Sequence, residues 1–145
     1  MIETRLDKNF KIKGFFDEET STISYVVYDM TSKKCAVIDS VLDFDFSSGT
    51  IDYHNAEKII SFIEKMKLDL EWLIETHVHA DHLSASPYIQ KKLGGKIGIS
   101  EKISDIQNIF GKTFNAGTEF QRDGSQFDRL FKDNDEYKIG SIKCK

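Results

Sequence analysis

The 145-residue sequence contains little proline or cysteine and no long hydrophobic run. Because there is only one proline, most turns must be formed by Gly, Asn, Asp and Ser. The two cysteines, Cys35 and Cys144, are too few for a disulfide framework, and we interpret them as reduced thiols. No apolar segment approaches the ~18 residues of a membrane span, and residues 1–16 lack a signal-peptide pattern. We therefore expect a cytoplasmic protein with no membrane partner.

The sequence also lacks an excess of basic residues. It has 20 Lys and Arg against 24 Asp and Glu, which gives a net charge of −4. A nucleic-acid-binding domain normally carries a basic patch, so we expect no nucleic-acid partner. The length fits one domain or part of a larger one, and we interpret residues 1–145 as a single, partial domain.

Apolar periodicity predicts strands that alternate with helices. Strands are predicted at 22–29 and 34–39, which would form a hairpin, at 70–75 and 96–99, and as short pieces at 128–131, 137–139 and 142–144. Helices are predicted at 55–67, 84–93 and 100–110, and long loops at 40–54 and 111–125. In the second helix Ser86 would be the N-cap, Pro87 the first helical residue and Gly94 the end. This order predicts an α/β layered domain.

Three of the four histidines lie in one short segment, T-H-V-H-A-D-H at residues 76–82, directly after the strand predicted at 70–75. Imidazole and carboxylate are ligands that suit zinc and iron, and α/β folds place ligand sites at the carboxyl ends of strands. In a turn His77 and His79 can share one metal ion, while Asp81 and His82 reach a second position nearby. The fourth histidine, His54, is predicted to be a surface residue.

The segment T-H-V-H-A-D-H, preceded by W-L-I-E and followed by L-S-A-S-P-Y, resembles the signature loop of the metallo-β-lactamase fold superfamily. Within it, the glyoxalase II and persulfide dioxygenase branch is the most similar. The A-V-I-D segment at 36–39 resembles an early strand that ends in Asp, and residues 124–131 and 133–140 resemble the stretch before the third metal-binding histidine. The resemblance runs from about Phe10 to Lys145 and implies the N-terminal half of an αββα sandwich.

The resemblance also implies a ligand set. His77 and His79 would bind a first metal ion, and Asp81 and His82 a second, with Asp81 also orienting the attacking water as the catalytic residue. If a single iron is bound instead, His77 corresponds to its first histidine. Asp39 would support the site without binding metal. The later ligands of the family, a third histidine, an Asp and a last histidine, are not present in the sequence, so each site lacks its third ligand.

Three functions are compatible with this resemblance. The first is a hydrolase similar to glyoxalase II, with two Zn2+ sites and a glutathione-linked thioester substrate. The second is an oxidoreductase similar to persulfide dioxygenases, with one Fe2+ and glutathione persulfide as substrate. The third is a catalytically inactive half-domain. Because half of such a fold leaves one sheet face uncovered, we expect self-association or a missing C-terminal half as partner.

Overall fold

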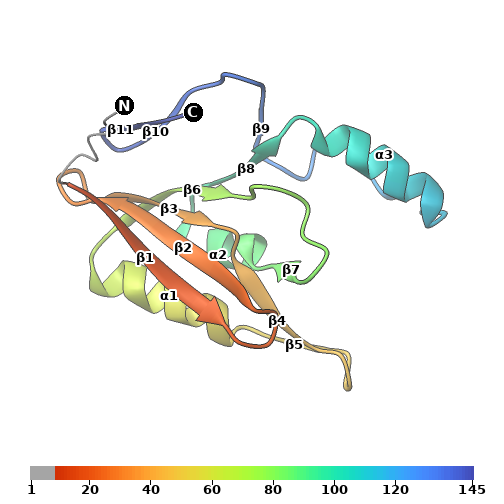
Figure 1. The fold of residues 1–145 in the computed structure, drawn as a ribbon, viewed down its shortest axis with the longest axis horizontal. Helices are drawn as coiled ribbons and strands as arrows, with labels where there is room; N and C mark the ends of the chain where they lie inside the picture. The colour runs from red at the N-terminus through yellow and green to blue at the C-terminus, as the bar shows by residue number, and fades with distance from the viewer. Residues whose placement is uncertain (1–8) are drawn as a thin grey trace, which may run out of the picture.

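The computed structural model describes residues 9–145 as a mixed α/β fold built on one large sheet (Figure 1). The expectation about a signal peptide concerns residues 1–16, of which 1–8 lie outside the described residues. The sheet has six strands in the order β1-β2-β3-β6-β8-β9. These are β1 (Phe10–Asp17), β2 (Thr22–Asp29), β3 (Lys34–Ile38), β6 (Asp69–Ile74), β8 (Lys96–Ser100) and β9 (Arg129–Phe131). The pairs β1–β2 and β2–β3 are antiparallel, and β3, β6, β8 and β9 are parallel.

The remaining elements of residues 9–145 are three helices and two small sheets. The helices are α1 (His54–Lys65), α2 (Ser86–Leu93) and α3 (Ile103–Thr113). One small sheet places β4 (Val41–Asp45) between β5 (Thr50–Asp52) and β7 (Leu83–Ser84), and the other is the hairpin of β10 (Tyr137–Ile139) and β11 (Ile142–Cys144). Helices α1 and α2 lie together on one face of the large sheet, and α3 extends away to one side (Figure 1). Within the described residues no helix is long and apolar enough to serve as a membrane span.

The main core lies between α1, α2 and the large sheet. The predicted apolar stripe of α1 is buried through Ile59 and Ile63, because residues four apart lie on the same helix face. These side chains belong to one cluster with Val26, Val37 and Leu73 from the sheet. The apolar periodicity that predicted this helix therefore reflects core packing, which fixes α1 on the sheet whose strand ends carry the histidine segment.

The opposite face of the sheet is covered only in part. The β10–β11 hairpin buries Ile139 against Val27 and Ala36. The indole Nε1 of Trp72 donates a hydrogen bond to the carbonyl of Lys138 at 3.0 Å, which joins the hairpin to β6. The hairpin therefore shields the middle of this face.

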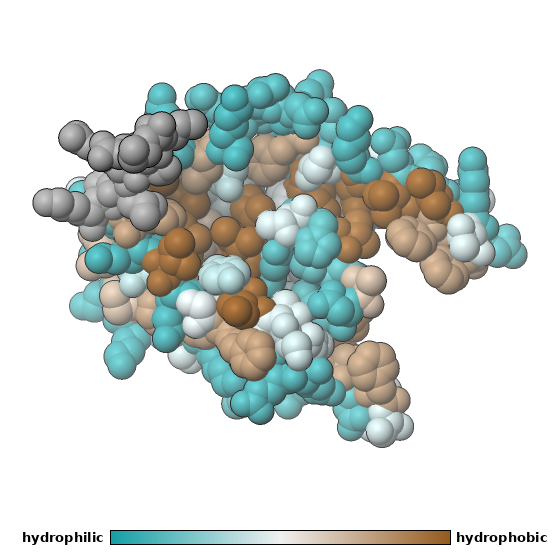
Figure 2. Space-filling model, in the orientation of Figure 1, coloured by the Kyte–Doolittle hydropathy of each residue, from teal (hydrophilic) through white to brown (hydrophobic). Residues whose placement is uncertain are grey.

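Beside the hairpin the same face is exposed. Ile23 and Tyr25 alternate with buried residues along β2, and they share a face with Val27 because side chains in a strand alternate. Ile12 and Phe16 pair with residues of this face from the edge strand β1. All four are exposed, and Figure 2 shows apolar side chains gathered over β1 and β2. We call Ile12, Phe16, Ile23 and Tyr25 the open sheet face.

Several predicted boundaries differ from the structure. Strand β1 was not expected, and β4 and β5 lie within the predicted loop at 40–54. Helix α3 runs over 103–113 instead of 100–110. The prediction that Ser86 caps α2 is wrong, because Ala85 occupies the N-cap and the Ser86 hydroxyl donates to a buried carboxylate instead. The expected end of α2 at Gly94 is confirmed by its positive φ of 78°.

Candidate metal centre

The histidine segment follows β6 at the carboxyl end of the parallel strands. Its first residue, Thr76, is bound by Asp39 at the end of the neighbouring strand β3. Asp39, directly after β3, accepts hydrogen bonds from the backbone N–H of Thr76 at 2.8 Å and from its hydroxyl at 2.6 Å. Since β3 and β6 are adjacent and parallel, their ends lie side by side at this edge. Asp39 therefore fixes the point at which the chain leaves the sheet.

The structure brings the predicted ligands together. The ring centroids of His77 and His79 are 4.4 Å apart, and those of His79 and His82 are 4.2 Å apart. Two groups have potential ligand atoms within 4.8 Å of one another: Asp39 with His77 and His79, and His79 with Asp81 and His82. The spacing in the sequence suggested separate pairs, 77 with 79 and 81 with 82, whereas in the structure His79 belongs to both groups. Neither group contains His54, which is exposed at the start of α1, as predicted.

His82 carries a direct sign of a ligand site. Its Nδ1 lies 2.9 Å from the carbonyl oxygen of Leu83, so Nδ1 carries the proton and donates it. Its Nε2 is buried and has no hydrogen-bond partner among the described residues. A buried polar atom without a partner is rare and costs free energy, and a metal ion is one of the groups that resolve it. The lone pair of this nitrogen therefore fits a metal ion.

His77 presents a free nitrogen in the same way. The hydroxyl of Thr76 donates its proton to Asp39, so it can only accept from His77 Nδ1, which lies 2.8 Å away. This assigns the proton of the His77 ring to Nδ1 and leaves the lone pair on Nε2. The residues of this loop fit a divalent cation, because His77 and His82 each keep an unprotonated nitrogen and the candidate ligand atoms of each group lie within 4.8 Å of one another.

The third ring is oriented by two carboxylates. Nε2 of His79 lies 2.9 Å from Glu75 Oε2 and 3.1 Å from Asp39 Oδ1. The hydrogen bond to Glu75 raises the pKa of His79, against the opposing effect of burial. Because both carboxylates are acceptors that face Nε2, the proton of the neutral ring sits on Nε2, and Nδ1 carries the lone pair.

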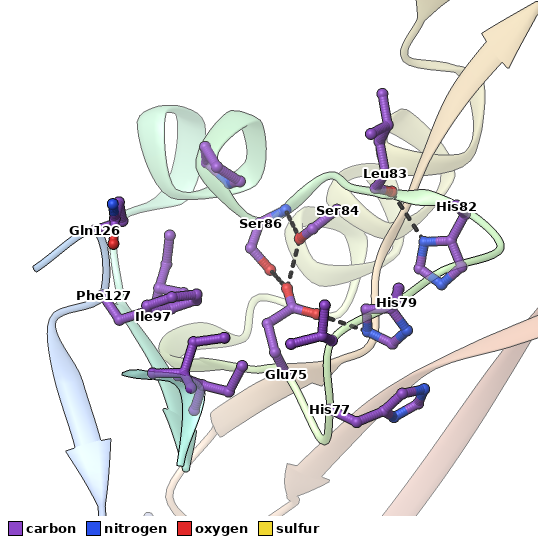
Figure 3. Close-up of a pocket in the computed structure, with 14 residues that line it drawn as sticks. Glu75, His77, His79, His82, Leu83, Ser84, Ser86, Ile97, Gln126 and Phe127 are labelled. Carbon is purple, nitrogen blue, oxygen red and sulfur yellow. Dashed lines mark hydrogen bonds and ion pairs between the residues drawn. The ribbon is translucent and has the colours of Figure 1, made fainter. Parts of the chain in front are cut away.

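Glu75 is the site residue that the sequence did not reveal. Burial alone raises the pKa of this carboxyl, but hydrogen bonds from His79, Ser84 and Ser86 outweigh burial and hold the pKa below its ordinary value. Figure 3 shows Glu75 lying between the two serines and His79. The available signal was a charged residue at the end of the otherwise apolar strand W-L-I-E, followed by two serines spaced two apart.

Asp81 is the exposed member of the predicted set. Its Oδ2 accepts a hydrogen bond from the hydroxyl of Thr22 on β2 at 2.9 Å. This hydrogen bond is the main reason why the pKa of Asp81 is lowered. The carboxylate is therefore ionised at neutral pH and is held near His79 and His82 by a residue 59 positions earlier in the chain.

Two cavities reach these histidines. One, of about 320 Å³, is lined by His77, His79 and His82 together with apolar residues that include Ile97 and Phe127 (Figure 3). The other, of about 610 Å³, is also lined by His77 and His79 and continues along α3. A small molecule in either cavity would lie against the histidine rings.

The chain belongs to the metallo-beta-lactamase superfamily, whose family model matches residues 18–141. It is 47% identical over 134 residues to a probable metallo-hydrolase of Burkholderia pseudomallei, a match that covers 92% of this chain and 46% of that protein. It is 38% identical over 136 residues to glyoxylase B2 of Dictyostelium discoideum, covering 93% of this chain and 47% of that protein. The chain thus spans less than half the length of these curated relatives.

Solved structures agree on the fold. The crystal structure of ETHE1 from Myxococcus xanthus matches with a TM-score of 0.64 and 20% identity, over 92% of this chain and 45% of that one. A metallo-beta-lactamase from Staphylococcus aureus matches with a TM-score of 0.62 and 22% identity, over 94% of this chain and 34% of that one. The predicted α/β class and metallo-β-lactamase fold are confirmed, and the partial coverage fits the expected N-terminal half.

Proposed function

We propose that this chain supplies ligands to the metal centre of a hydrolase that cleaves a glutathione-linked thioester, as glyoxalase II does. The observation that carries the proposal is the convergence of three imidazole rings, each of which keeps an unprotonated nitrogen in its neutral form, beside the carboxylate of Asp81. The relatives support the reaction class. They include the metallo-hydrolase and glyoxylase B2 described above, and a hydroxyacylglutathione hydrolase of Vibrio vulnificus that is 31% identical over 104 residues.

His77 and His79 would hold one Zn2+, and Asp81 and His82 a second. Bound zinc supplies a nucleophile at neutral pH and polarises the thioester carbonyl. In hydrolysis a water oxygen adds to the carbonyl carbon, the C–S bond breaks, and a proton passes to the departing sulfur. The Asp81 carboxylate, with one oxygen on Thr22, keeps its other oxygen for the second zinc site, where it would also orient the attacking water.

A second candidate function rests on a different group of side chains. Asp39, His77 and His79 form a two-histidine, one-carboxylate set, the combination typical of non-haem iron oxygenases. The sequence alone assigned only His77 to such a site. A chain of this kind would hold one Fe2+ and act with O2 on glutathione persulfide. A persulfide dioxygenase of Bos taurus is 24% identical over 96 residues. A catalytically inactive half-domain is the remaining alternative.

The open sheet face supports a partner for this centre. Ile12, Phe16, Ile23 and Tyr25 are exposed side by side, and the chain spans under half of its curated relatives. We propose that a C-terminal half or a second copy of the chain covers this face. Such a partner would also supply the third ligand that each metal site lacks.

Metal analysis together with two activity assays tests these proposals. The assays are hydrolysis of S-lactoylglutathione and oxygen consumption with glutathione persulfide, each with Zn2+ and with Fe2+. We expect two zinc ions per centre and thioester hydrolysis, with enzyme-like turnover only when a C-terminal half is added. Iron alone with persulfide-dependent oxygen consumption would select the second function, and absence of both metals would select the inactive half-domain. Robust turnover by the isolated chain would contradict the missing-ligand argument.

A further inference from the structure

Glu75 is a buried carboxylate with a full set of hydrogen bonds. Its side chain is 5% exposed at the end of β6. Its Oε1 accepts from the hydroxyls of Ser84 and Ser86, both at 2.5 Å, and its Oε2 accepts from Nε2 of His79 at 2.9 Å. Burying an ionised group is costly unless hydrogen bonds compensate it, and here they do. The carboxylate is therefore held in one orientation.

The two serines lie on the segment that returns from the histidine loop. Ser84 ends β7 and Ser86 begins α2, and the backbone N–H of Ser86 donates to the hydroxyl of Ser84 at 3.1 Å. Ser86 also lies 3.2 Å from the hydroxyl of the buried Ser40. One carboxylate thus ties the outgoing part of the loop, at residue 79, to its returning part at 84–86 (Figure 3).

This arrangement has a consequence for His79. A neutral imidazole carries one proton, so a ring that donates from Nε2 has its lone pair on Nδ1. Metal-binding histidines commonly donate their other N–H to a carboxylate, which fixes the ring and makes it a better ligand. Asp39 also faces Nε2, but both of its oxygens accept from Thr76, whereas Oε2 of Glu75 faces His79 at the shorter distance.

We propose that Glu75 is a positioning residue, held by Ser84 and Ser86, that keeps His79 in the tautomer whose Nδ1 is free to bind metal. This inference rests on the proposed metal centre but concerns a residue outside the ligand set. It also assigns a role to the L-S-A-S segment after the histidines. The Ser84 and Ser86 hydroxyls would set the ligand geometry through Glu75 without touching the metal.

The test is Glu75→Gln. The carboxylate has two acceptor oxygens for the three donors His79, Ser84 and Ser86, whereas the amide has only one acceptor oxygen. Two measurements are made on the purified chain. The first is Zn2+ affinity by competition with a chromogenic chelator, and we expect binding to weaken roughly 10- to 100-fold. The second is the tautomer of His79 in the metal-free chain by long-range 15N NMR. We expect the Nε2–H form to dominate in the wild type and to lose that dominance in the variant.

Glu71→Gln is the matched control. Glu71 lies near the start of the same strand, accepts a hydrogen bond from the backbone N–H of Gly140 at 2.9 Å, and belongs to neither group of candidate ligands. It should leave both measurements unchanged. If Glu75→Gln does not fold, Ser84→Ala and Ser86→Ala each remove one donor to Glu75 and should give smaller losses in the same direction.

The outcomes separate this inference from the proposed function. An unchanged His79 tautomer and unchanged Zn2+ affinity in Glu75→Gln would overturn the positioning role. A wild-type chain that binds no metal would contradict the metal centre, while the NMR measurement would still decide whether Glu75 sets the His79 tautomer.

Discussion

Asp29 accepts two hydrogen bonds from Ser141, which lies 112 residues further along the chain: one from the backbone N–H at 3.0 Å and one from the hydroxyl at 2.6 Å. The backbone N–H of Thr31 and the hydroxyl of Ser32 complete the set, and the Asp29 side chain is fully buried. The turn of the β10–β11 hairpin is therefore anchored at the end of β2.

Asp29→Ala should release this hairpin. The substitution leaves the Ser141 donors without their acceptor and opens the cluster around Ile139. We expect the melting temperature to fall by about 4 °C or more. The single tryptophan, Trp72, reports the change by fluorescence because its indole donates to the hairpin. Asp45→Ala is the control, since Asp45 holds an exposed turn at Ser47. Equal melting of the two variants would contradict the anchoring role.

The same carboxylate predicts a pH dependence. The hydrogen bonds from Ser141, with those from Ser32 and Thr31, hold the pKa of Asp29 well below its usual range. A group whose pKa is lowered by folding stabilises the protein fully above its unfolded pKa, about 3.9, and loses this contribution as the pH falls toward the folded pKa. The difference in unfolding free energy between wild type and Asp29→Asn should therefore be constant above about pH 4 and shrink in stronger acid. Denaturant titrations between pH 2 and 7 measure it, and a difference that already shrinks near pH 6 would refute the prediction.

Metal binding should depend on the loop histidines and not on His54. We expect His77→Ala, His79→Ala and His82→Ala each to reduce Zn2+ binding at least about tenfold, because each removes one ring nitrogen from the cluster. His54→Ala should bind as the wild type does, since His54 is exposed at the start of α1. Isothermal titration calorimetry distinguishes the variants. If His54→Ala loses as much binding as His77→Ala, the ligand assignment is wrong.

The open sheet face should make the isolated chain self-associate. Ile12 and Phe16 are 56% and 57% exposed on the edge strand β1. We expect light scattering to show dimers or larger species, and the double substitution Ile12→Ser with Phe16→Ser to shift them to monomer. Phe46→Ser is the control, because Phe46 is 79% exposed beside β4, away from this face. A wild-type chain that stays monomeric at high concentration would contradict self-association through the open sheet face.

The fold could be predicted where periodicity is strong. Helix α1 and the apolar strands β2, β3, β6 and β8 all pack on one core. Their apolar residues therefore recur with the spacing of a helix or a strand, which can be seen in the sequence. Strand β1 was missed because it is an edge strand with lysines between its apolar residues. Strands β4 and β5 were missed because their aspartates are typical of a loop. Strand β4 is stabilised by pairing with β5 and with β7, and the pairing with β7 joins residues far apart in the sequence.

The candidate site, too, could be predicted from the sequence only in part. His77, His79, Asp81 and His82 are neighbours in the sequence, so their clustering is a local property of one turn. Two of the groups that orient them come from other strands: Thr22 from β2 and Asp39 from the end of β3. Those contacts depend on the order of strands in the sheet, which spacing along the chain does not encode. The sharing of His79 between two groups is likewise a property of the folded loop.

The two cavities at the histidines have a common wall. Val78, between His77 and His79 in the sequence, lines both the 320 Å³ cavity and the 610 Å³ cavity, as do the two histidines. A ligand that filled both spaces would contact the imidazole rings of His77 and His79 from each of them. Ile99 of β8 and Ile103 of α3 line both cavities as well, so the histidine loop, the sheet and α3 together form the boundary between them.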